Sequence, residues 1–310
     1  MASVTTTEAG LLSVAQVRGR YCYDCRPTDQ LFQALPFLPI EGDQLKLGMI
    51  DAATTGLASF AGAVAAGAAI NTTMPAISSR TFGFSHITGE MPVDVLIPGV
   101  YGNKEDVVQA LLNIKVDAVR DVFKNLLVNG TGASNQFKGV RDLCQDYGQA
   151  IGADNGNANG GTVQKGEVEK LLALLHPRVT NDATYLVMHP NAYKHLLKNN
   201  YQYEEVVRIE GVGNVPVLAG VAVLLDEFIS IAETVGTSND CTSIYAVILG
   251  EDVGLCGIYP ASAKGREIQV RGPVVKDAAD TMWYHVSWDA GIAVFNKCSI
   301  ARLSGVKQAN

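Results

Sequence analysis

The chain has 310 residues and a formal net charge of −7 at pH 7; 47% of its residues are apolar and only 18% are charged. This length suggests one large or two modest domains, and a charged fraction below the usual ~25% hints that some surface is buried against partners. The negative charge argues against a protein that coats nucleic acid. Residues 1–14 lack a signal peptide, and the most apolar stretch, residues 57–70, is shorter than the ~20 residues that span a bilayer. We therefore expect a soluble, non-secreted protein with no membrane segment.

The first hundred residues are predicted to depend on contacts with other parts of the protein or with another subunit. Residues 1–30 are small and polar without a sustained period, which is typical of an arm, and residues 31–40 set two prolines among large apolar residues, which predicts an extended segment packed on a core. Residues 42–99 are rich in Gly, Ala, Thr and Ser, and their second half alternates like strands. A loop this long is unusual inside a compact domain, and an isolated hairpin is marginally stable. We therefore expect this excursion to lie on another subunit.

A long amphipathic helix is predicted over residues 104–128, where apolar residues recur at i, i+3 and i+4. Asn103 is suited to cap its start, and Glu105 and Asp106 place negative charge in the first turn. Gly130 is suited to end it in a left-handed conformation. About 25 residues at ~1.5 Å each give a rod of roughly 37 Å. Taken alone, this pattern is equally typical of an ordinary central helix of an α/β domain.

The second half of the chain mixes helices and strands after a loop rich in Gly and Asn at residues 148–161. Helices are predicted at residues 165–175 and from Pro190 onward. Strands are predicted at residues 183–189, 215–225, 243–249, 266–275 and 281–296. This irregular order favours an α+β fold over regularly alternating βαβ units.

The six cysteines contain one CxxC pair, Cys22 and Cys25. A zinc ribbon would need a second such pair or nearby histidines. Pro27 follows the pair almost directly, whereas a redox pair normally opens a helix. We therefore expect scattered reduced thiols rather than a metal or redox site.

No catalytic motif survives inspection. The glycines at 211 and 213 begin like a dinucleotide loop, but Pro216 stands where the third glycine would be. Neither a phosphate-binding loop, a GxSxG turn nor an HExxH pair occurs. His189 and His195 are poorly spaced to share a metal, and the alternation around His285 is typical of a structural histidine on a strand. We expect no catalytic residue, no cofactor site and no metal site, so the chain is not predicted to be an enzyme.

Six segments, taken in order, carry a resemblance to a known family. They are LFQALPFLPIEG at 31–42, NLLVNGTGASNQFKGV at 125–140, YLVMHPNAYKHLL at 185–197, GVAVLLDEF at 220–228, SIYAVILGEDVGLCGIY at 243–259 and WYHVSWDAGIAVFNKCSIARLSGV at 283–306. Each segment is weakly specific, but their order and spacing cover nearly the whole chain. The chain resembles the major capsid proteins of tailed bacteriophages, of the Hong Kong 97 type.

The resemblance implies the Hong Kong 97-type capsid fold, an α+β architecture. Its parts would be an N-arm at 1–41, an extended E-loop hairpin at 42–98, a P-domain with its spine helix at 99–138, an A-domain at 139–255 and P-domain strands at 256–310. It also implies a structural function, in which copies self-assemble as pentamers and hexamers into an icosahedral shell. That shell would enclose phage double-stranded DNA without sequence-specific binding, forming in the host cytoplasm and persisting in the virion.

Further partners implied by the resemblance are a scaffolding protein, a portal and a decoration protein. Because only a short arm precedes the match, we expect scaffolding to be a separate protein or absent. Some relatives form a Lys–Asn cross-link, but nothing in the sequence assigns that role to Lys46, so we expect non-covalent assembly. Two alternatives stay open: an encapsulin-like nanocompartment shell, and a soluble α/β enzyme with an unrecognised site.

Overall fold

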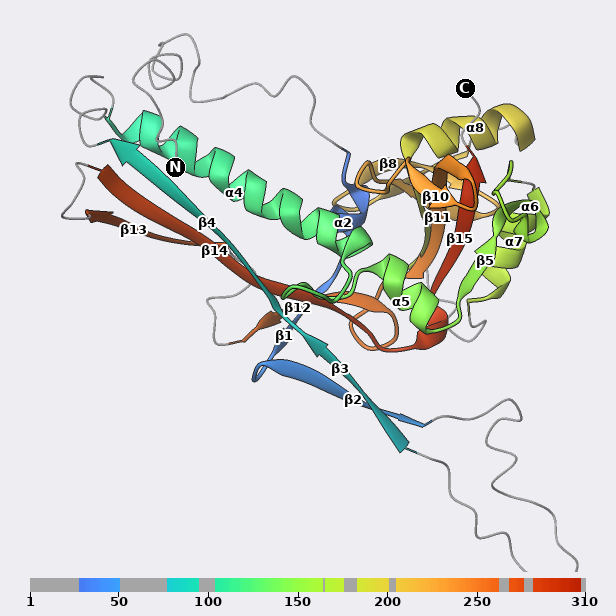
Figure 1. The fold of residues 1–310 in the computed structure, drawn as a ribbon, viewed down its shortest axis with the longest axis horizontal. Coiled ribbons are helices and arrows are strands. Elements are labelled where there is room, and N and C mark those ends of the chain that lie inside the picture. Colours follow the sequence, from blue (N-terminus) through green and yellow to red (C-terminus); the bar gives the residue numbers. More distant parts are fainter. Residues whose placement is uncertain are drawn as a thin grey trace, which may run out of the picture.

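The computed structural model describes the chain in eight ranges: residues 28–50, 77–94, 104–163, 165–175, 183–200, 205–261, 268–275 and 281–307. These ranges form two main sheets and a separate hairpin (Figure 1). The first sheet has five strands, in the order β1-β12-β14-β13, with β4 also paired to β14. The second has eight strands, in the order β5-β15-β11-β6-β9-β8-β7, with β10 paired to β11. The α+β prediction is confirmed.

The strands and helices have the following bounds. The first sheet comprises β1 Phe37–Ile40, β4 Ser85–Asp94, β12 Leu255–Pro260, β13 Gln269–Val275 and β14 Thr281–Val294, and the hairpin comprises β2 Gln44–Ile50 and β3 Ile77–Gly83. The second sheet comprises β5 Ala150–Gly152, β6 Thr184–Met188, β7 Glu205–Ile209, β8 Gly213–Leu218, β9 Val221–Leu225, β10 Glu233–Val235, β11 Ser238–Ile248 and β15 Ile300–Lys307. The helices are α2 Gln30–Ala34, α4 Lys104–Asn129, α5 Val140–Asp146, α6 Ala153–Gly156, α7 Lys165–Ala173, α8 Pro190–Asn200 and the 3₁₀ helix η2 Lys297–Ser299.

The long helix α4 lies along the two longest strands of the first sheet, β4 and β14 (Figure 1). Its predicted extent is confirmed, while the proposed cap Asn103 lies outside the described residues. Gly130 does end the helix, and its N–H donates to the Leu126 carbonyl at 2.9 Å. It is not left-handed, however. Glycine is required there because a Cβ would lie 2.4 Å from the Phe137 carbonyl oxygen, too close for any side chain.

An aromatic cluster joins this helix to the sheet and to the segment before it. The Phe123 ring, fully buried, lies 4.7 Å from Trp288, 5.5 Å from Phe137 and 5.8 Å from Phe32, measured between ring centroids. Phe32 belongs to α2, so the prediction that residues 31–40 are extended throughout is wrong for their first half. The prolines restrict only the residues next to them, which leaves one helical turn free to form before Pro36.

The second sheet is buried on both faces. The side chains of Leu186 and Met188 face α7 and α8, whereas that of Val187 faces the core shared with α4. The predicted strand at 215–225 is in fact two strands, because the chain turns back at Ala219 and Gly220, with φ angles of 53° and 78°. Two central residues with positive φ make a tight hairpin turn. The sequence has no Asn-Gly pair at this point, so the turn could not be recognised within the continuous apolar run.

The remaining predicted helices and strands are confirmed near their expected bounds. Two placements differ from a grouping by sequence. Strand β4 lies within the 42–98 excursion, yet it pairs along its whole length with β14 and buries Ile87, Met91 and Val93. The expectation that the whole excursion lies on another subunit is therefore too broad. Strand β15, at the end of the 256–310 group, lies in the second sheet instead of the first.

Candidate functional site: a buried junction and two uncovered surfaces

Residues 28–34 connect the end of the predicted arm to the second sheet, and we call them the clasp. Asp29 forms an antiparallel bridge with Asp226, just after β9. The Thr28 carbonyl accepts a hydrogen bond from the Glu227 N–H at 3.0 Å, and the Gln30 side-chain oxygen accepts one from the Leu225 N–H at 2.8 Å. The clasp therefore continues the pairing of β9 beyond its end.

Lys124 of α4 reaches the same place from the other side. Its side chain is 2% exposed, and its ammonium lies 2.7 Å from Asp29 and 2.8 Å from Asp121. The ring centroids of Phe32 and Phe228 lie 5.6 and 5.7 Å from the ammonium. A charge this deeply buried is tolerated only when partners replace its water. Lys124 therefore ties the helix to the clasp.

The contact between the clasp, the end of β9 and Lys124 of α4 is called the junction below. Asp226 is a second buried ionisable group in it. It is 1% exposed, and one carboxyl oxygen accepts a hydrogen bond from the Phe228 N–H at 2.8 Å. Burial raises the pKa of Asp226 from 3.8 to about 7, and the negative charge of Asp29 raises it too, while the Phe228 N–H and Lys124 lower it. This carboxyl group titrates near neutral pH.

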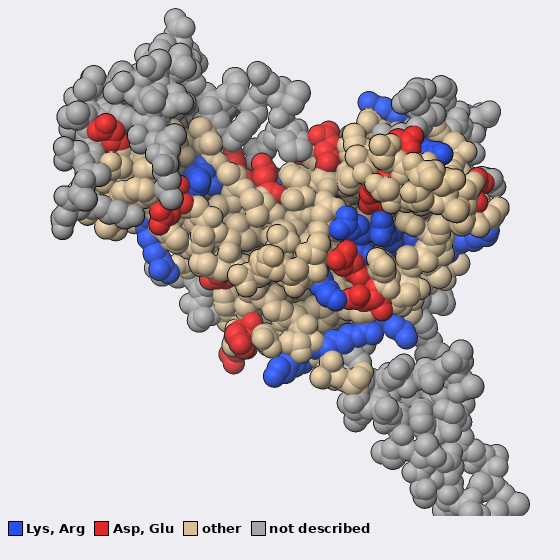
Figure 2. Space-filling model, viewed as in Figure 1, with Lys and Arg blue, Asp and Glu red and all other residues tan. Residues whose placement is uncertain are grey.

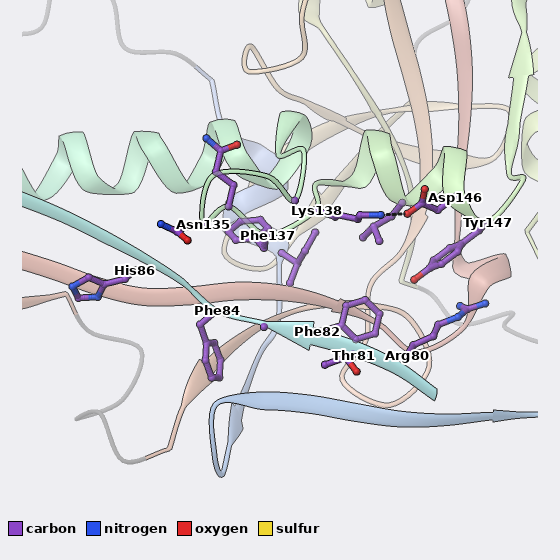
Figure 3. A pocket seen from close by; sticks show the side chains of 15 residues that line it. Arg80, Thr81, Phe82, Phe84, His86, Asn135, Phe137, Lys138, Asp146 and Tyr147 are labelled. Carbon is purple, nitrogen blue, oxygen red and sulfur yellow. Dashed lines mark hydrogen bonds and ion pairs between the residues drawn. The ribbon is translucent and has the colours of Figure 1, made fainter. Parts of the chain in front are cut away.

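A groove of about 600 Å³ lies between β3, the 130–139 loop and α5 (Figure 3). Its charged groups have partners inside the subunit. The Lys138 ammonium lies 2.5 Å from Asp146, the Arg80 guanidinium lies 4.1 Å from the centroid of the Tyr147 ring, and His86 contacts Asp289. Burial raises the pKa of Tyr147, so this phenol is a poor proton donor or base near neutral pH. The contact of Arg80 with Tyr147 joins strand β3 of the hairpin to the end of α5 across this groove.

Two apolar surfaces are exposed or only partly buried in the part of the subunit that the structure describes. One is strand β13, where Val270, Val274 and Val275 are 46%, 59% and 61% exposed. Among the described strands, β13 has a neighbour on one edge only, because it pairs with β14 alone. The other is the first half of α4, where Leu112 and Val116 pack against the core but are only partly buried. Edge strands with exposed apolar side chains favour pairing with another chain.

Charged side chains of both signs are spread over the face that Figure 2 shows. Lys, Arg, Asp and Glu are interspersed between the second sheet and the base of the hairpin, and further charged side chains follow α4, which carries Lys115, Asp117, Arg120 and Asp121.

The residues considered for chemistry are not brought together. Cys22 and Cys25 lie outside the described residues, and the turn at 211–213 simply joins β7 to β8. Burial raises the pKa of the Cys144 thiol to about 12, which makes it unreactive. Within the described ranges, no group of three His, Cys, Asp or Glu side chains could hold a metal ion.

Sequence inspection missed the junction because its members are far apart in the chain. Lys124 follows the buried Phe123 directly and adjoins the apolar face of a helix, which is a signal that a partner carboxylate is needed. Which carboxylate supplies it could not be read from the sequence. Of the helices that the structure describes, none is long and apolar enough to cross a bilayer.

Comparison with known proteins supports the fold alone. No family model matches the chain, and no curated protein does. Among solved structures, it is similar to the SrpI encapsulin of Synechococcus elongatus PCC 7942, with a TM-score of 0.69, 17% identity and 96% of each chain covered. It is also similar to the capsid of the native GTA particle, with a TM-score of 0.65, 15% identity and 99% of each chain covered. A structure of Mycobacterium phage Adephagia gives a TM-score of 0.57 and 10% identity, covering 96% of this chain and 98% of that one. The chain has the fold of capsid and encapsulin shell proteins, and the resemblance to Hong Kong 97-type capsid proteins is confirmed at the level of the fold.

Proposed function

We propose that this chain is a structural protein that self-assembles into an icosahedral shell, and specifically the major capsid protein of a tailed phage enclosing double-stranded DNA. The observation that carries the proposal is the match of nearly the whole chain, from end to end, to proteins whose structures are shells. The uncovered valines of β13 support it independently, because a lone subunit would leave them in water.

The domains follow from this proposal with two adjustments to the sequence grouping. The N-arm covers residues 1–41 and the E-loop begins at residue 42, with α4 as the spine helix of the P-domain. Because β4 pairs with β14, it belongs to the P-domain together with β12–β14. Because β15 pairs with β11, it belongs to the A-domain with the rest of the second sheet. The E-loop proper is then the β2–β3 hairpin and the residues between its strands.

The same proposal makes the chain a non-enzyme whose main partners are copies of itself. Pentamers and hexamers would form the shell, with a portal and possible scaffolding and decoration proteins as further partners. A net charge of −7 fits a shell that holds DNA without binding particular sequences. Assembly would take place in the host cytoplasm, and the mature location would be the virion.

An encapsulin-like nanocompartment is the second candidate. Its support is the match to the SrpI encapsulin, with a TM-score of 0.69 over 96% of each chain. The two differ in what the shell holds. Shells purified from the native source would carry a co-purifying cargo protein in the encapsulin case, which mass spectrometry of the shells detects. Shells without a stoichiometric protein cargo favour the capsid.

The most informative test of assembly shortens the E-loop without touching the subunit core. Ile50 and Ile77 are directly paired at the end of the β2–β3 hairpin, so residues 51–76 can be replaced by Asn-Gly, which closes two paired strands as a tight turn. If the E-loop reaches a neighbour, the shortened chain keeps its thermal midpoint as a subunit but forms no shells in negative-stain images.

Two results would overturn the E-loop assignment. Shells of normal size from the shortened chain would mean that residues 51–76 make no essential contact. Loss of the folded subunit would mean that they belong to its core.

A further inference from the structure

The clasp contacts two parts of the subunit that are far from each other in the sequence. It binds the end of β9 through Asp29, Thr28 and Gln30, and it binds α4 through the ion pair of Asp29 with Lys124. We propose that the clasp is a pH-sensitive latch between the long helix and the second sheet, closed in mild acid and loosened above neutral pH by repulsion between Asp29 and Asp226. This inference stands whether or not the chain forms a shell.

Geometry places the two carboxylates against each other. The antiparallel bridge sets Asp29 and Asp226 opposite one another on the two segments that the latch joins. Residues directly opposite across an antiparallel pair have Cβ atoms about 5 Å apart. Like charges at such positions repel, and they repel more strongly where water is excluded. Asp226 is 1% exposed, and the Asp29 side chain is 16% exposed.

Among the described residues, the charged groups at this junction are one ammonium group and several carboxylates. Lys124 already neutralises Asp29 and also contacts Asp121. When Asp226 is protonated, one ammonium faces two carboxylates; when it ionises, the same ammonium faces three. Glu227 adds another negative charge on the same loop and raises the pKa of Asp226.

His189, just before α8, lies close enough to this loop for the charge of Glu227 to raise its pKa, but it does not supply a second cation. Burial lowers the pKa of His189, so its ring is neutral at the pH where Asp226 titrates. Its Nδ1 accepts a hydrogen bond from the Asn191 N–H at 3.1 Å, which also favours the neutral ring.

The direction of the pH effect follows from linkage. Burial raises the pKa of Asp226 from 3.8 to about 7 in the closed state, and opening returns the carboxyl group to water. The closed state therefore binds more protons than the open state between these two values. The opening equilibrium constant rises about tenfold for each pH unit from about 4 to 7 and levels off above 7. The latch is firmest in mild acid.

Hydrogen–deuterium exchange of the full chain measures this opening directly. The informative amides are those of Leu225 and Glu227, which donate to the clasp. After correction for intrinsic exchange rates, their protection should fall on the order of 100-fold between pH 5 and pH 8. The amides of Tyr245 and Ala246, in the buried strand β11, serve as an internal reference and should keep their protection.

Two substitutions separate the latch from a general loss of stability. Asp226→Asn keeps an oxygen that can accept from the Phe228 N–H but cannot ionise, so the protection of Glu227 should no longer depend on pH. Asp121→Asn is the matched control, because Asp121 binds the same lysine but is 42% exposed and does not face Asp226 across the bridge. It should keep most of the pH dependence.

Any of three results would overturn the latch. The first is equal protection of the Leu225 and Glu227 amides at pH 5 and pH 8. The second is a fall in their protection that is matched by an equal fall in β11. The third is a pH dependence of their protection that persists in Asp226→Asn. Should Asp226→Asn fail to fold, Asp29→Asn removes the opposing charge instead. The pH dependence should then shrink, and an unchanged dependence would contradict the proposal.

Discussion

Strands β11 and β13 have similar apolar content but opposite surroundings. From Cys241 to Ile248, every residue of β11 is buried, whereas every residue of β13 after Gln269 is exposed. Strand β11 has neighbours on both edges and side-chain layers on both faces, while β13 has β14 on one edge. Valines alone therefore do not distinguish a strand that completes the subunit core from one left for a partner.

The same contrast runs along the single helix α4. Its second half buries Val119, Phe123 and Leu127, while its first half leaves Leu112 and Val116 only partly covered. Both halves follow one amphipathic pattern. The difference lies in what they pack against, because only the second half meets the clasp and its aromatic side chains. Among the described residues, the first half of α4 is therefore less deeply buried than the second.

Phe123→Ala should show the largest effect on the subunit. This ring is fully buried among four other aromatic rings, so its truncation should lower the free energy of unfolding by about 3–5 kcal/mol in urea denaturation. Its neighbour Val122 is 47% exposed, and Val122→Ala should change the value by less than about 0.5 kcal/mol. Equal effects would mean that the inner half of α4 is not core.

Asp226→Asn should change the pH dependence of stability. Because the folded pKa of Asp226, about 7, lies above its unfolded value of 3.8, the wild type loses stability as the pH rises through this window. The variant should therefore be more stable than the wild type by roughly 2–4 kcal/mol at pH 8 and similar to it below pH 4. Urea denaturation at the two pH values checks this. A parallel pH dependence in both proteins would contradict it.

Arg80→Gln should have a smaller and local effect. The guanidinium stacks on Tyr147 and holds the hairpin base to α5, so its loss should weaken that contact by about 1 kcal/mol. Exchange protection in β2 and β3 should fall while that of β11 stays. Lys46 lies exposed on the opposite face of the same hairpin, so Lys46→Gln is the control that should leave protection unchanged.

Val274→Asp should have the smallest effect on the subunit and a large one on assembly. The side chain is 59% exposed, so unfolding should shift by less than about 0.5 kcal/mol. A charge on an uncovered edge strand opposes pairing with another chain. Light scattering should show that assembly is lost, whereas Val274→Ile, which stays apolar, should assemble normally. Normal assembly of Val274→Asp would show that β13 is not an interface.

Local patterns were enough to predict the long helix, most strands and the α+β class, whereas the capsid fold was predicted from the resemblance to a known family. They failed where distant residues decide the structure. The pairing of Asp29 with Asp226 and Lys124 joins positions that no periodicity links. The expectation that the whole 42–98 excursion lies on another subunit was too broad, because alternation predicts the strand β4 but not that its partner is β14. The turn at Gly220 was hidden in a continuous apolar run.

Sedimentation velocity of the purified wild-type chain over a range of concentrations, with negative-stain images of each fraction, tests the central proposal most directly. A shell protein should give fast-sedimenting closed particles, or pentamers and hexamers that convert to them as the concentration rises. A single species at the 32.9 kDa of one chain, unchanged at every concentration, would contradict it.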